Sequence, residues 1–208
     1  MAIPAQILPS QKAIAESALS LVGKPNLKFA NRSFPWDCSG TVLAALWVAG
    51  LDVRGEYGSF GGNGVNRLHE IARQHQIEYD LPLPEIGDIV FWDNTYDKNE
   101  DLKWNDELTH TGIIVDVKPD GTITYVHHDY RRGIVTAEMN LFLPDSRDAT
   151  LLDGTTRIIN SPLRMNKDRY LNPDKWLSAQ LFRSFGRFHV LLDELKPMTL
   201  VATAPASR

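Results

Sequence analysis

The chain contains a single cysteine, Cys38, which lies at the start of a predicted helix. Apolar residues at three- and four-residue steps predict that helix over 37–49, and Gly50 suits its C-terminal end. Amide N–H groups and the positive end of the helix dipole favour a thiolate there, which is the nucleophilic form of cysteine. The small residues Ser39 and Gly40 would let a substrate carbonyl approach. Because free cysteine is also a common buried residue, this position alone leaves both interpretations open.

Two histidines further along the chain could supply the base and the group that orients it, which a thiol nucleophile requires. His110 begins a predicted strand that continues over 111–117, and His127 lies on the strand that returns over 122–126. The residues between them, Lys-Pro-Asp-Gly over 118–121, have the composition of a tight turn. The two histidines are therefore expected on one β-hairpin.

The register of this hairpin decides which histidine lies beside the first. If Val117 pairs with Thr122, Gly112 faces His127, and the two histidines share one face of the hairpin. A slip of one residue would place His128 there instead, and turn chemistry alone does not choose. Two other interpretations stay open. The histidines could be unrelated residues at a sheet edge, or they could form a zinc site with the cysteine, although no paired ligand spacing such as CxxC is present.

The elements that must position these residues predict an α+β fold, with helices followed by antiparallel strands. A glycine-rich loop is expected over 55–64, and Pro173 suits the start of a last helix. We expect one catalytic domain over 1–140, an extension over 141–196 packed on it, and a tail over 197–208. The predicted elements are helices over 11–22, 37–49, 65–75 and 174–185, and strands over 89–92, 111–117, 122–126 and 134–136.

Composition narrows the class of protein. The 208 residues are 43% hydrophobic and 23% charged, as in ordinary globular proteins, and the net charge of −4 does not favour a nucleic-acid partner. One cysteine excludes a disulfide within the chain. The sequence has no run of eighteen apolar residues and no basic N-terminal region, so we predict neither a membrane span nor a signal peptide.

Three segments together resemble the NlpC-type cell-wall peptidases. Asp-Cys-Ser-Gly-Thr-Val over 37–42 matches their cysteine motif, Gly-Asp-Ile-Val-Phe-Trp over 87–92 resembles their second motif, and His-Thr-Gly-Ile-Ile-Val over 110–115 resembles their histidine strand. The order is that of the family, and Gly-Lys-Pro over 23–25 precedes them. Asp-Gly-Thr-Ile-Thr over 120–124 is similar to the hairpin of the related CHAP amidases.

The resemblance implies a papain-like α+β fold and cleavage of amide bonds in peptidoglycan stem peptides, in many members between D-glutamate and a diamino acid. It implies that Cys38 is the nucleophile, that His110 is the base, and that His127 takes the third position, with His128 as the alternative. It implies no metal and no organic cofactor. The residues expected near the oxyanion or the substrate are Trp36, Asp37 and Ser39.

Two further classes of function stay open at this stage: another thiol acyl-transfer enzyme, such as an acyltransferase or deamidase, and a non-catalytic cell-wall binding module. An acidic insertion over 93–108 could be a lid or a recognition loop for a cationic group, or a solvated surface loop. The expected partner is peptidoglycan or a muropeptide, with an inhibitor or immunity protein if the chain is an exported toxin. Action on the cell wall, in the periplasm or after export, is expected, with cytoplasmic muropeptide recycling as the alternative.

Overall fold

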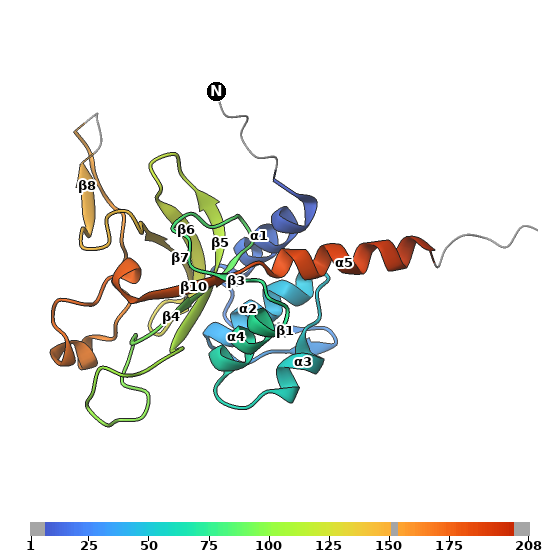
Figure 1. Cartoon of the computed structure of the whole chain (residues 1–208), viewed down its shortest axis with the longest axis horizontal. Coiled ribbons are helices and arrows are strands. Elements are labelled where there is room, and N and C mark those ends of the chain that lie inside the picture. Colours follow the sequence, from blue (N-terminus) through green and yellow to red (C-terminus); the bar gives the residue numbers. More distant parts are fainter. Residues whose placement is uncertain (1–6, 151–153, 202–208) are drawn as a thin grey trace, which may run out of the picture.

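The computed structural model describes residues 7–150 and 154–201, with helices and an antiparallel sheet in an α+β arrangement (Figure 1). The α-helices are α1 (Pro9–Leu21), α2 (Cys38–Val48), α3 (Arg54–Ser59), α4 (Gly64–Gln74) and α5 (Phe188–Val201). The strands of the main sheet are β3 (Glu78–Tyr79), β4 (Ile89–Trp92), β5 (His110–Val117), β6 (Ile123–Asp129), β7 (Gly133–Met139) and β10 (Phe182–Gly186). Two small ribbons pair β1 (Lys28–Phe29) with β2 (Arg32–Ser33) and β8 (Asp148–Thr150) with β9 (Thr156–Ile158).

The main sheet has the strand order β3-β10-β4-β5-β6-β7, and all its neighbours are antiparallel. Strands β4 to β7 follow one another in both sequence and space, as consecutive hairpins do. The exception is β10, which inserts between β3 and β4 although it lies near the C-terminal end of the chain. The C-terminal segment is thus built into the sheet that carries both predicted catalytic histidines.

Each face of the sheet is covered by a different part of the chain. Helices α1, α2 and α4, with the first turns of α5, pack on the face that includes Phe91, Ile113 and Val126. The opposite face includes Trp92 and Tyr125 and is covered by residues from the C-terminal segment, among them Ala179 and Leu181. Figure 1 shows the helices on one side of the sheet and the segment that carries β8 on the other.

The predicted helices over 11–22, 37–49 and 65–75 and the four predicted strands are confirmed within a few residues. The N-cap of α1 is Leu8, and the Ser10 hydroxyl in the first turn donates to Asp193 in α5. No helix in the described ranges is long and apolar enough to cross a membrane.

Two predictions about local structure were wrong, and a third lies mostly outside the described residues. The segment over 174–185 forms a short 3₁₀ helix (Ser178–Leu181) and then β10, because pairing with two strands overrides its local preference. The glycine-rich loop over 55–64 contains part of α3. The tail expected over 197–208 is helical up to Val201, and residues 202–208 lie outside the described residues.

Candidate active site

Helix α2 begins at Cys38, and its preceding residue fixes the local geometry. Asp37 is the N-cap, and its carboxylate accepts hydrogen bonds from the Gly40 amide at 2.7 Å and the Ser39 hydroxyl at 2.8 Å. Glycine is required at position 40, because a Cβ there would lie 1.9 Å from the Pro35 carbonyl oxygen. Asp37 and Ser39, predicted near the oxyanion or substrate, thus have structural contacts that set the start of the helix.

The Cys38 side chain is partly buried between α2 and the sheet. The backbone amides of Thr111 in β5 and of Ser39 and Cys38 at the helix start act to lower the pKa of the Cys38 thiol. Burial, and then the negative charge of Asp37, nevertheless raise the pKa of the Cys38 thiol to about 12. The expectation that the helix start favours a thiolate is therefore wrong for the resting protein, because desolvation and a carboxylate outweigh the amides.

The two predicted catalytic histidines meet on the hairpin of β5 and β6. Nε2 of His110 lies 2.9 Å from Nδ1 of His127, with the rings nearly perpendicular. Gly112 pairs with His127 as predicted, but the predicted pairing of Val117 with Thr122 is wrong: Val117 pairs with Ile123, and an irregularity between Ile114 and Asp116 shifts the register back by one residue. A side chain at position 112 would crowd the Val126 carbonyl, which lies 2.8 Å from an added Cβ, so the glycine makes room for this pair.

Both histidines are neutral at physiological pH. Burial, together with the neighbouring His128, lowers the pKa of His110 to about 4, although Asp129 and Asp37 act in the opposite direction. Burial and the charge of His110 lower the pKa of His127 as well. Each imidazole can therefore accept a proton at physiological pH.

His128 points away from this pair and towards the segment before α2. Its ring meets the Trp36 ring edge-on, with centroids 4.8 Å apart. Trp36 also lies against Gly133 and is 42% exposed. Ser39, by contrast, is buried.

Cys38 and the histidine pair both border the first residues of β5, Cys38 on the side of the sheet that α2 covers and the histidines on the side of Trp92 and Tyr125. No hydrogen bond between the Cys38 sulfur and a His110 nitrogen is present in the part of the chain that the structure describes. The link is the Thr111 amide, which acts on the Cys38 sulfur and belongs to the residue directly after His110. Sequence reasoning missed this amide, since a strand amide carries no sequence signal.

The acidic insertion places one further residue near the nucleophile. Tyr96 is half-buried, and its pKa is raised by burial and then by negative charge at Cys38 and Asp106. Its phenol therefore lies within electrostatic range of the sulfur. Trp92 does not line a cleft, because its ring is fully buried and its Nε1 donates to the Ser178 carbonyl at 2.9 Å.

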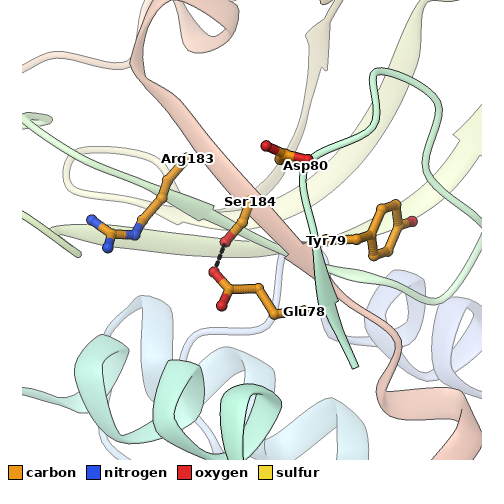
Figure 2. Close-up of a pocket in the computed structure, with 5 residues that line it drawn as sticks. All are labelled: Glu78, Tyr79, Asp80, Arg183 and Ser184. Atoms are coloured by element: carbon orange, nitrogen blue, oxygen red, sulfur yellow. Dashed lines mark hydrogen bonds between the residues drawn. The ribbon is translucent and has the colours of Figure 1, made fainter. Parts of the chain in front are cut away.

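A separate pocket of about 290 Å³ lies at the edge of the sheet, between β3 and β10 (Figure 2). Ser184 points at the Glu78 carboxylate and donates to it at 2.7 Å, and Nε2 of His69 lies 2.5 Å from the same oxygen. Burial alone would raise the pKa of Glu78, but these hydrogen bonds outweigh it and lower the pKa. The Glu78 oxygen that accepts from Ser184 also contacts His69, so no free base lies beside Ser184 to activate it as a nucleophile. It is lined by Glu78, Tyr79, Asp80, Arg183 and Ser184.

Within the described ranges, no three His, Cys, Asp or Glu side chains form a group that could hold a metal ion. The zinc site considered for Cys38, His110 and His127 is therefore not formed. Comparison with family models, with curated proteins and with solved structures finds no match for this chain.

Proposed function

We propose that this chain is a papain-like cysteine peptidase or amidase that hydrolyses amide bonds in peptidoglycan stem peptides. The observation that carries the proposal is the 2.9 Å contact between His110 Nε2 and His127 Nδ1, at the start of the strand whose Thr111 amide acts on the Cys38 thiol. Thr111 directly follows His110, and Cys38 is the only cysteine of the chain, which supports a thiol nucleophile with His110 as its base.

The histidine pair leaves a suitable nitrogen for the thiol. Nε2 of His110 is occupied by His127, so the base is Nδ1, the ring nitrogen nearer the backbone. That backbone runs directly into Thr111, whose amide acts on the sulfur. The productive tautomer carries a proton on His110 Nε2, donates it as a hydrogen bond to His127 Nδ1, and keeps Nδ1 free to accept the thiol proton.

The reaction then proceeds from a neutral pair. His110 Nδ1 takes the Cys38 proton as the sulfur attacks the amide carbonyl, and the new C–S bond gives a tetrahedral oxyanion. The Cys38 amide at the positive end of α2 stabilises that oxyanion. The C–N bond breaks, and the imidazolium of His110 gives its proton to the leaving amine. Water, deprotonated by the same imidazole, cleaves the thioester and restores the thiol.

The peptidoglycan substrate is supported by the resemblance of the segments over 37–42, 87–92 and 110–115 to NlpC-type peptidases. The insertion over 93–108 adds to this, since it carries six acidic and two basic residues directly before His110. The net acidic charge of the insertion would attract a stem peptide that bears a free amino group, and the proposed bond is that between D-glutamate and a diamino acid.

Digestion of purified peptidoglycan tests the proposal. The wild-type protein should release muropeptides with new amino and carboxyl termini, identified by mass spectrometry, and Cys38→Ser should release none while its circular dichroism is unchanged. Transfer of the acyl group to an added amine, without new carboxyl termini, would instead indicate an acyltransferase. Wild-type protein that sediments with peptidoglycan but cleaves nothing would contradict the proposal and indicate a binding module.

A further inference from the structure

The insertion over 93–108 forms a closed loop between β4 and β5. The Asn94 amide donates to the Asp106 carbonyl at 2.7 Å, which joins the two limbs of the loop. The Thr95 amide donates to the Thr109 hydroxyl at 2.9 Å, which fastens the base of the loop next to β5. The interior of this loop is the part of the molecule that the proposed hydrolysis leaves without a role.

Two carboxylates are buried inside the loop with unused oxygens. Asp97 is 5% exposed and Asp106 is 2% exposed. Asp97 Oδ2 accepts from the Leu102 amide at 2.9 Å, and Asp106 Oδ1 accepts from the Lys98 amide at 3.0 Å, so both side chains reach across the loop. Asp97 Oδ1 and Asp106 Oδ2 are buried and have no hydrogen-bond partner in the described residues.

The charge of Arg164 acts electrostatically on Asp97 and Asp106, but Arg164 forms no ion pair with either carboxylate in the described residues. Arg164 is buried beside the loop, but its guanidinium donates to the backbone carbonyls of Asn94 and Asp168 and stacks on the Trp104 ring, 4.4 Å from its centroid. Neither carboxylate forms an ion pair within the described ranges. Buried carboxylate oxygens without a partner carry a large desolvation cost, which a bound cation would offset.

We propose that this loop binds a hard divalent cation, with Ca²⁺ as the preferred ion. Asp97 and Asp106 each supply a carboxylate oxygen, Asn99 supplies its amide oxygen, and backbone carbonyls and water complete the shell. The spacing Asp-x-Asn-x-Asp over 97–101 is that of calcium loops, and Leu102, with φ of +61°, stands where those loops have a glycine. The loop departs from the EF-hand pattern at Leu102 and in having Leu108 where that pattern has glutamate.

This site does not depend on the proposed hydrolysis, and its test needs no substrate. Isothermal titration of the chelator-treated wild-type protein with CaCl₂ should show one saturable site, and the same titration with MgCl₂ should show weaker binding. At about a hundredfold excess of Ca²⁺ over its dissociation constant, the Tm should rise by roughly 5–10 °C. A wild-type protein with neither binding heat nor a Tm shift at about 10 mM CaCl₂ would overturn the proposal.

Matched variants in the loop locate the ion. Asp97→Asn and Asp106→Asn should each weaken Ca²⁺ binding by about tenfold or more, because each removes a charged ligand. Glu100→Gln removes the same charge from an exposed position of the loop and should leave the affinity within about twofold. Binding that survives both aspartate changes would place the ion elsewhere and overturn the proposal.

A luminescent probe decides the question if an aspartate variant fails to fold. Tb³⁺, which replaces Ca²⁺ in oxygen sites, should emit strongly in the wild-type protein when the loop's Trp104 is excited. Trp104→Phe should keep Tb³⁺ affinity but lose most of that emission. Unchanged emission would mean that Tb³⁺ does not bind in this loop, and the proposal would fail.

Discussion

The structure contains two histidines, His110 and His69, that each contact another polar side chain but differ in the kind of partner. His110 contacts another histidine, has no direct carboxylate partner in the described residues, and has its pKa lowered to about 4. His69 lies 2.5 Å from Glu78, a carboxylate that also accepts from Ser184. The second group contains a serine, a histidine and an acid, yet the acid sits between the other two. A base held by a carboxylate on its reactive side cannot take a proton from a nucleophile, whereas a neutral imidazole with one open nitrogen can.

The largest expected effect separates these two histidines by activity. His110→Ala should lower kcat for peptidoglycan hydrolysis by roughly 10²- to 10⁴-fold, because it removes the general base. His69→Ala should leave kcat within about threefold but destabilise the fold by about 2–3 kcal/mol, since it strands a partly buried carboxylate. Kinetics and thermal unfolding of both variants measure this difference. Equal losses of activity in the two folded variants would contradict the assignment of His110, and not His69, as the general base.

A smaller effect is expected from the residue that orients the base. His127→Ala should lower kcat by roughly 10- to 100-fold with little change in KM, because a neutral histidine supplies orientation and no charge. His127→Asn should recover part of the loss, since an amide oxygen can accept the same ring N–H. The ratio of the two kcat values is the readout, and a His127→Asn variant no better than His127→Ala would argue against an orienting hydrogen bond.

The depressed pKa of His110 also predicts a pH dependence of stability. Below its unfolded pKa of 6.5, the unfolded chain binds a proton that folded His110 takes up only near pH 4. Stability is therefore highest above pH 6.5 and is lost as pH falls towards 4, by about 2 kcal/mol between pH 7 and pH 5 from this residue. Urea unfolding at both pH values tests this. His110→Gln should lose less stability on acidification than the wild type, and an equal loss would place the effect on other groups.

The hairpin and the helix of this site could be predicted from the sequence because local signals fix both. The composition of 118–121 predicts the turn of the hairpin and apolar periodicity predicts α2, but the pairing of Gly112 with His127 also requires the irregularity between Ile114 and Asp116, which has no local signal. The place of β10 could not be predicted, because it pairs with strands about 90 residues or more away that leave no local pattern. The protonation state of the Cys38 thiol could not be predicted either, since it depends on burial by elements distant in sequence.

The smallest expected effect concerns Asp37, which contributes both to the start of α2 and to the pKa of the thiol. Its carboxylate caps α2 and, after burial, is the second cause of the raised pKa of Cys38. Asp37→Asn keeps a good capping side chain but removes the charge, so the thiol pKa should fall while the helix stays intact. Because Cys38 is the only cysteine, its alkylation by iodoacetamide can be followed by mass without ambiguity. The alkylation rate at pH 8 should rise severalfold, by less than about tenfold, since burial is the larger cause and persists.

Asp129→Asn, which removes a carboxylate that acts on His110 and not on the thiol, serves as the control. A rate that is unchanged in Asp37→Asn, or raised equally in both variants, would show that burial alone sets the thiol pKa.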